Sequence, residues 1–146
     1  MEILNKIKEN SILKIKEDFY KVLSKSEYNT VENDEIYWKY KLEQNKILVI
    51  IPSDKIIYFG EEVEETNSID LNTERFIYKN EEYAQIAKGN QLYLKTIFGV
   101  PLEKNCIFVD FENTEKTKVL SLAVLENNKR SDIHAKYLKM EDISVC

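Results

Sequence analysis

The chain has few of the residues from which phosphate-binding loops and metal sites are built. Its 146 residues include three glycines, two cysteines and one histidine. Gly60, Gly89 and Gly99 are too scattered to form a glycine-rich phosphate loop, which needs several glycines within a few positions. A zinc site needs about four clustered cysteine or histidine ligands, more than the sequence holds. We therefore predict neither a metal site nor a bound cofactor, and the familiar nucleotide-dependent enzymes are disfavoured.

A nucleophilic cysteine–histidine pair would have to come from Cys106 and His134. Cys106 opens the apolar run CIFVDF, where a thiol usually behaves as a small buried hydrophobic group. His134 shares one side of its expected strand with Lys136, which favours a partly exposed position. The well-separated Cys106 and Cys146 are not expected to form a disulfide in a reducing cytosol. The residues form no recognisable catalytic constellation, so we expect a protein that is not an enzyme.

Charge and hydropathy argue against nucleic-acid and membrane partners. The formal net charge is −5, and Arg75 and Arg130 are the only arginines, whereas nucleic-acid recognition favours a basic surface rich in arginine. No apolar run approaches the roughly 18–20 residues that a membrane-spanning helix needs. The opening MEILNKIKEN lacks the charged-then-apolar layout of a signal peptide. We expect a cytoplasmic location, no bound nucleic acid and no direct membrane insertion.

From about residue 35 onward, the chain alternates as half-buried β-strands do. One face of segment 36–42 carries Ile36, Trp38, Tyr40 and Leu42. Tryptophan and tyrosine are common binding anchors, but a face shared with two aliphatic residues favours core packing. The apolar run 47–51 and the segment 55–59 follow after short polar turns. Together, these segments predict a three-stranded meander.

A polar, acidic stretch at 61–74 is expected to be a solvated connector, and strands resume after it. Residues 75–87 predict two strands around a turn at Asn80, and Lys88-Gly89-Asn90 predicts a further turn. More strands are expected over 92–98, 106–112, 119–126 and 134–138. The 13 asparagines are expected to supply most left-handed turn conformations. The first 25 residues fit either a continued helix or a hairpin after a short helix, and we favour the short helix followed by strands.

The two halves of the chain, 11–60 and 75–145, resemble each other. Segment 36–40 parallels 107–111, and each is followed by a polar turn and a strongly apolar strand. The match needs gaps, so chance similarity between β-hairpins is the alternative. We expect a single mainly-β domain over residues 1–146, in which two related antiparallel meanders form a sandwich or partly open barrel, with a short N-terminal helix. The acidic loop 61–74 would join the halves.

Three segments also carry a family resemblance. Trp38-Lys39-Tyr40-Lys41-Leu42 is similar to a Trp-x-Glu-Tyr-x-Leu type motif, with Lys39 in place of the acid. FIYKNEEYAQIAKG resembles the start of a second half, and Leu120-Ser121-Leu122-Ala123 resembles a Leu-Ser-x-Glu strand, with Ala123 in place of the acid. On these segments the chain, from about Ile12 to Val145, resembles the bacterial domain of unknown function DUF4178. The resemblance implies a β-rich fold and a bacterial accessory role, and it brings no reaction with it.

These observations lead to two expected functions of different classes. The first is a non-catalytic binding or adaptor module of a bacterial-type cytoplasmic system that contacts another protein, with a homodimer as one form of that contact. The alternative is a small-ligand-binding or sequestering (inhibitor) protein with a pocket between the two meanders, and an enzyme with a carboxylate-only site ranks third. A concave site lined by inward-facing lysine or glutamate would favour the ligand binder, and an exposed apolar strand edge would favour the adaptor.

The candidate interaction face comprises the residues opposite the apolar sides of the two repeated strands. It consists of Tyr37, Lys39, Lys41, Phe108, Asp110 and Glu112. The repeat places two lysines where the other strand has two carboxylates, and opposite charges on neighbouring strands attract. The two faces are therefore expected to meet, within the monomer or across a two-fold dimer, with Tyr37 against Phe108. The alternative is that both faces are simply solvated.

Overall fold

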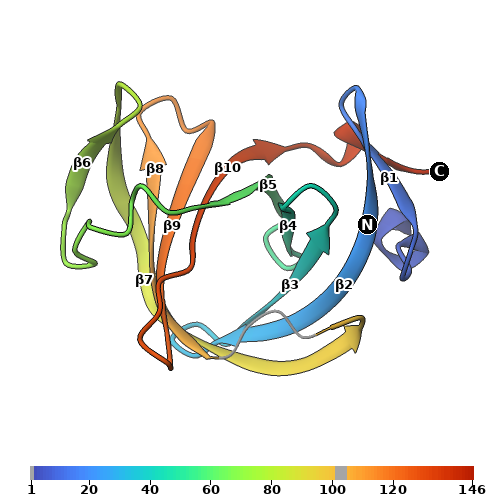
Figure 1. The fold of residues 1–146 in the computed structure, drawn as a ribbon, viewed down its shortest axis with the longest axis horizontal. Helices are drawn as coiled ribbons and strands as arrows, with labels where there is room; N and C mark the ends of the chain where they lie inside the picture. Colours follow the sequence, from blue (N-terminus) through green and yellow to red (C-terminus); the bar gives the residue numbers. More distant parts are fainter. Residues whose placement is uncertain (1, 101–104) are drawn as a thin grey trace.

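The computed structural model describes residues 2–100 and 105–146, and its central feature is a closed antiparallel β-barrel (Figure 1). The elements in chain order are η1 (Glu2–Lys6), β1 (Ile12–Ile15), β2 (Asp18–Thr30), β3 (Glu35–Leu42), β4 (Lys46–Ile51), β5 (Ile56–Val63), β6 (Arg75–Tyr78), β7 (Glu81–Phe98), β8 (Cys106–Asn113), β9 (Lys118–Leu125), β10 (Asp132–Leu138), η2 (Met140–Asp142) and β11 (Ile143–Val145). The ring runs β2-β3-β4-β5-β10-β9-β8-β7 and returns to β2. The mainly-β prediction is confirmed, but the barrel is closed rather than a sandwich or a partly open barrel.

Closure depends on two unusually long strands, β2 and β7. Residues 18–21 of β2 pair with β1, and residues 25–30 pair with β7 on the same edge. Likewise, residues 81–84 of β7 pair with β6, and residues 91–98 pair with β2. Each strand is interrupted by register shifts, which bend a strand and increase its twist. A long, bent strand can therefore hold a flanking strand at one end and close the ring at the other.

The same order of antiparallel neighbours occurs twice along the chain. Strands β1 to β5 pair in succession, and strands β6 to β10 do the same. The β2–β7 and β5–β10 pairs then join the two meanders into one ring. In the β5–β10 pair, Gly60 lies opposite Ala135, and a Cβ at residue 60 would stand 2.0 Å from the His134 carbonyl oxygen. The strands can come this close at residue 60 only because it is glycine.

Several local predictions need correction. β7 continues through Lys88-Gly89-Asn90, where a turn was expected. Gly89 instead pairs with Phe108 of β8, and the atoms nearest to a Cβ there would be side-chain atoms, chiefly the carboxylate end of the exposed Glu32. β5 extends to Val63, so the connector begins at Glu64, and it is not simply solvated, since Thr66 is buried and Ile69 packs on a core.

The turns and the N-terminus are partly as expected. Left-handed backbone occurs at Asn10, Asn45, Asn80 and Asn128, but lysine also adopts it at Lys16, Lys55, Lys79 and Lys116. The N-terminal helix is a five-residue 3-10 helix, and a β1–β2 hairpin follows it. In the part of the chain that the structure describes, no helix is long and apolar enough to span a membrane.

Both faces of the barrel wall are covered. η1, β1 and β11 pack on the outer face of β2 to β5, around the fully buried Tyr40. β6 and the connector pack on the outer face of β7 to β10, around Tyr83 and Phe111. The interior has its own apolar cluster, which includes Tyr28, Val49, Tyr58, Val119 and Ile133. The expected core role of Trp38 and Tyr40 agrees with their places in the outer cluster, and the polar face of the same strand points into the barrel.

A candidate binding cavity inside the barrel

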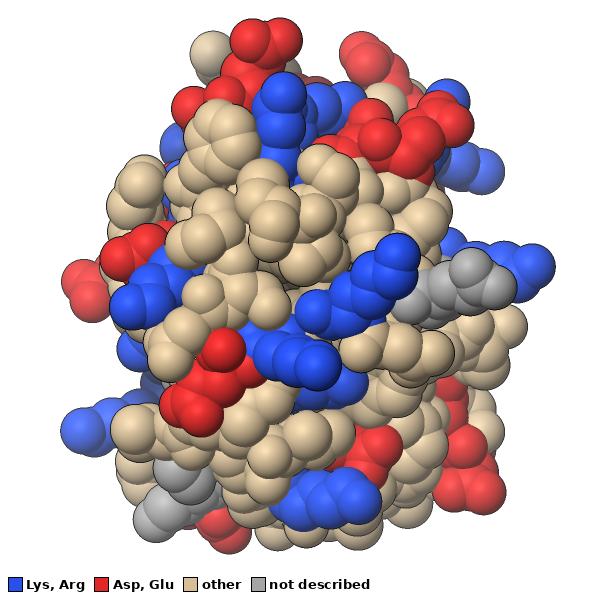
Figure 2. All heavy atoms as spheres, turned by 90° about the vertical axis from the view of Figure 1, so that its right-hand side faces the viewer, with Lys and Arg blue, Asp and Glu red and all other residues tan. Residues whose placement is uncertain are grey.

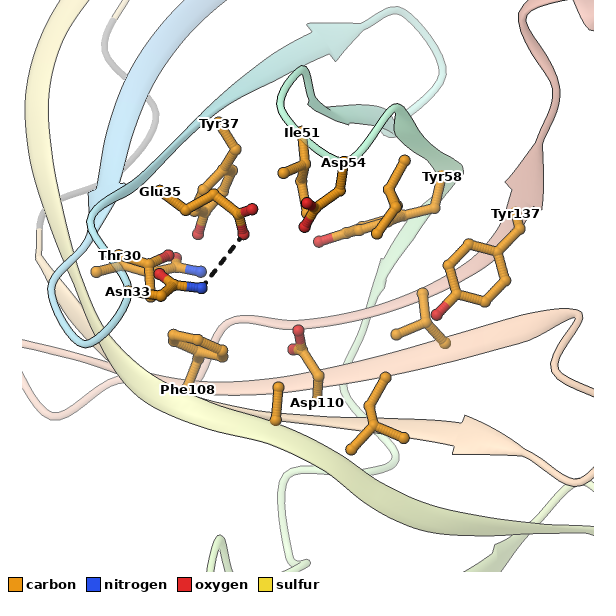
Figure 3. Close-up of a pocket in the computed structure, with 15 residues that line it drawn as sticks. Thr30, Asn33, Glu35, Tyr37, Ile51, Asp54, Tyr58, Phe108, Asp110 and Tyr137 are labelled. Carbon is orange, nitrogen blue, oxygen red and sulfur yellow. Dashed lines mark hydrogen bonds between the residues drawn. The ribbon is translucent and has the colours of Figure 1, made fainter.

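A cavity of about 250 Å³ lies inside the barrel, next to the β2–β3 and β4–β5 turns (Figure 3). It is lined by Thr30, Asn33, Glu35, Tyr37, Ile51, Asp54, Ile56, Tyr58, Ile86, Ala87, Gln91, Phe108, Asp110, Val119 and Tyr137. These residues come from both meanders, because the ring brings β3, β4 and β5 opposite β7, β8 and β9. The volume is slightly below the usual range for small-molecule sites, about 300–1,000 Å³.

Two carboxyl groups, Glu35 and Asp54, form one acidic wall. Glu35 Oε2 accepts a hydrogen bond from Ser53 Oγ at 2.8 Å, and Glu35 Oε1 accepts one from Asn33 Nδ2 at 3.4 Å. Burial and the adjacent Asp54 carboxyl raise the pKa of Glu35, while the bonds from Ser53 and Asn33 oppose the shift. Glu35 therefore keeps a proton to higher pH than an ordinary glutamate, and the pair can share it.

Asp110 forms the facing wall and is the most perturbed carboxyl group of the cavity. Burial raises its pKa to about 6, although a hydrogen bond from Ser121 and the positive charge of Lys39 both act to lower it. Its Oδ1 is shielded from solvent and has no hydrogen-bond partner among the described residues. Figure 3 shows the Asp110 carboxylate pointing into the same space as the carboxylates of Glu35 and Asp54. A shielded acceptor without a donor is costly, which makes this oxygen the natural contact for a ligand.

Four aromatic side chains complete the wall. Tyr37 stacks on Tyr28 with ring centroids 5.5 Å apart, and Tyr58 meets Tyr137 edge-on at 6.5 Å. Tyr137 donates a hydrogen bond from its hydroxyl to Glu112 Oε2 at 2.9 Å, and burial is the largest cause that raises its pKa. Phe108 is buried on the opposite strand. These rings give the cavity apolar faces beside its carboxylates.

The structure separates the six residues of the expected interaction face. Tyr37, Phe108 and Asp110 line the cavity, and Lys39 is buried near Asp110, on whose pKa its charge acts. Lys41 instead lines a separate 140 Å³ hollow with Glu62 and Ser131, whereas Glu112 bonds Tyr137. β3 and β8 run in opposite directions in the ring, and of the expected charge pairs the structure brings Lys39 close enough to Asp110 for their charges to interact.

Sequence reasoning did not single out Glu35, Asp54, Tyr58 or Tyr137. Glu35 opens β3 and Asp54 lies in a turn, so each has the sequence context of an ordinary surface acid. Tyr58 and Tyr137 lie opposite each other in the β5–β10 pair, which joins segments far apart in the chain. Alternate side chains of β5 point into the barrel, and this alternation is the one local signal that could have identified Tyr58.

Cys106 and His134 lie in different environments. Cys106 is buried, and its thiol donates to Gln91 Oε1 at 3.3 Å. His134 belongs to the outer layer, where its Nε2 is 3.0 Å from the Tyr83 hydroxyl and its ring meets Tyr78 edge-on. Burial and nearby lysines lower the pKa of His134. Across residues 2–100 and 105–146, no group of three or more acidic, cysteine or histidine side chains is placed to hold a metal ion.

Comparisons with protein families, curated proteins and solved structures find no match to this chain. The resemblance to DUF4178 therefore stays a prediction.

Proposed function

We propose that the protein binds a small molecule in the cavity between its two meanders. The observation that carries this proposal is the shielded, unpartnered Asp110 Oδ1 on the wall of a 250 Å³ cavity. Pockets that combine apolar and aromatic walls with a few convergent polar groups are the usual form of a small-molecule site. The barrel also provides rigid support, because hydrogen bonding between neighbouring strands joins the strands around the cavity into a closed ring.

A fragment screen detected by protein NMR tests this proposal. Fragments of up to about ten heavy atoms should shift the amide signals of Tyr58 and Asp110 in the wild type. Ala87→Phe places a ring in the cavity, since Ala87 lines it, and should abolish these shifts. Ala84→Phe is the matched control on the same strand but outside the cavity lining, and it should retain them. Fragments that bind Ala87→Phe as well as wild type, or no hits at millimolar concentration, would contradict the proposal.

A second candidate function, protein binding along β7, is favoured by exposed apolar residues. Leu92, Leu94 and Ile97 are 42%, 47% and 44% exposed, in the stretch past Gln91 where β8 no longer pairs with β7. By contrast, the face over β1 and η1 carries interspersed basic, acidic and uncharged side chains (Figure 2). Exposed apolar side chains next to an unpaired edge are typical of protein-binding strands.

Sedimentation velocity over a range of concentrations tests the homodimeric form of this candidate. The wild type should self-associate, and Leu94→Glu should shift it toward the monomer, because a buried charge without a partner opposes association. Ile77→Glu, at an exposed position on β6, is the control and should behave as wild type. A wild-type protein that stays monomeric at all concentrations would rule out the homodimer.

A further inference from the structure

We propose that the ligand is a small protonated amine whose ammonium group binds Asp110 beside the tyrosine rings of the cavity. This inference rests on the proposed function and names its ligand class. Among the residues that the structure describes, the lining includes three acids, Glu35, Asp54 and Asp110, and no lysine or arginine. An anionic ligand would face like charge on two walls, whereas a cation would be attracted by both.

The charge balance of the cavity leaves room for one added cation. Lys39 offsets Asp110, and its Nζ lies 5.3 Å from the centroid of the Tyr28 ring. Glu35 accepts hydrogen bonds from the neutral side chains of Ser53 and Asn33, so a Glu35–Asp54 pair that shares one proton still carries one negative charge. The interior therefore already holds one ammonium beside a tyrosine and an aspartate, and the remaining negative charge of the acidic wall attracts a second cation into the cavity.

Hydrogen bonding favours an amine over a cation without N–H groups. Asp110 Oδ1 lacks a donor, and a primary ammonium brings three. Aromatic rings attract a cation over their faces, and Tyr37, Tyr58 and Phe108 stand around the same space (Figure 3). The acids are not grouped for metal binding among the described residues, which favours an organic cation.

The volume sets the size of the ligand. A volume of about 250 Å³ corresponds to roughly eight water molecules at their share of liquid volume. A short alkylamine fits this space, with its chain against Ile51, Ile56 and Val119 and its ammonium at Asp110. Larger amines, such as those with two fused rings, should be excluded.

Matched titrations of pentan-1-amine and pentan-1-ol, each monitored by protein NMR at neutral pH, test the inference. The two probes share length and shape and differ in charge. The wild type should bind the amine roughly tenfold more tightly than the alcohol, as expected for one charge-assisted hydrogen bond. Asp110→Asn should reduce this preference to about twofold or less, whereas Asp18→Asn, an exposed aspartate in the β1–β2 hairpin, should leave it unchanged.

A second variant keeps the test independent of the fold of Asp110→Asn. The double variant Glu35→Gln with Asp54→Asn removes the charge of the acidic wall at positions more exposed than a fully buried one and should also weaken amine binding while leaving alcohol binding unchanged. Equal affinity for amine and alcohol in the wild type would overturn the amine inference and leave the cavity as a binding site. Absence of binding by both probes, together with a fragment screen without cavity hits, would overturn the proposed function itself.

Discussion

Replacing Asp132 by alanine should lower the free energy of unfolding by about 3–5 kcal/mol, the cost of breaking a buried ion pair from one side. The Asp132 side chain is fully buried at the start of β10 and accepts hydrogen bonds at 2.6 Å from Thr66 Oγ1 and at 3.0 Å from both Nε and Nη2 of Arg130. Arg130 in turn donates to the backbone carbonyls of Thr66, Asn67 and Ile69. The alanine variant would leave Arg130 without its counter-charge and release the connector from the barrel.

Urea unfolding followed by tryptophan fluorescence measures this cost. Asp18→Ala, at an exposed aspartate, is the control and should change stability by less than about 0.5 kcal/mol. Hydrogen exchange should also accelerate in residues 64–74 of the Asp132 variant, because these residues lose the carbonyl contacts that hold them. A loss below about 1 kcal/mol would mean that the ion pair is no stronger than an exposed one.

Local periodicity predicted most of the strands, because alternation depends only on which face of a strand is buried. The β8–β9 hairpin and the strand at 36–42 illustrate this, since β3 covers Glu35–Leu42 and β8 covers Cys106–Asn113. The turn expected at 88–90 was wrong because these residues pair with β8, with Gly89 opposite Phe108 and Asn90 opposite Ile107. The backbone N–H of Asn90 also donates to Glu32 Oε1, 58 residues away in the chain. No local pattern records such a contact.

Ring closure was the largest feature that the sequence did not reveal. It depends on the pairing of β2 with β7, for example Tyr28 with Tyr93, and on the bends that make this pairing possible. Both halves of each long strand look alike in sequence, although one half pairs with a flanking strand and the other closes the barrel. A partly open barrel and a closed one therefore have the same hydrophobic pattern.

The candidate site was predictable only where the two halves repeat. Alignment of the halves put Lys39 and Asp110 at equivalent positions, and the structure places them near each other in the interior. The same alignment also put Lys41 opposite Glu112. In the structure Lys41 lines a hollow with Glu62, and Glu112 accepts a hydrogen bond from Tyr137, so a contact between Lys41 and Glu112 stays a prediction for two copies of the chain.

Asp110 should make the free energy of unfolding fall by about 2 kcal/mol as the pH rises from 4 to 7. Its pKa is about 6 in the folded protein, against an ordinary value of 3.8. The folded state therefore holds this proton over a range in which the unfolded chain loses it, and stability declines as the pH rises through 6. A shift of about two pKa units corresponds to about 3 kcal/mol over the whole titration, of which about 2 kcal/mol falls between pH 4 and pH 7.

Unfolding curves of wild type and Asp110→Asn at several pH values isolate this contribution. Asparagine cannot ionise, so the wild type should lose stability relative to the variant between pH 4 and pH 7. The variant also leaves Lys39 without its carboxylate, but this shifts its unfolding free energy by the same amount at every pH and does not affect the comparison. The Asp18→Asn variant should show a wild-type pH dependence, and parallel curves for wild type and Asp110→Asn would contradict a raised pKa. Pentan-1-amine at neutral pH should recover part of the lost stability in the wild type alone, because a bound ammonium stabilises the ionised carboxylate and binding to the folded state raises its stability.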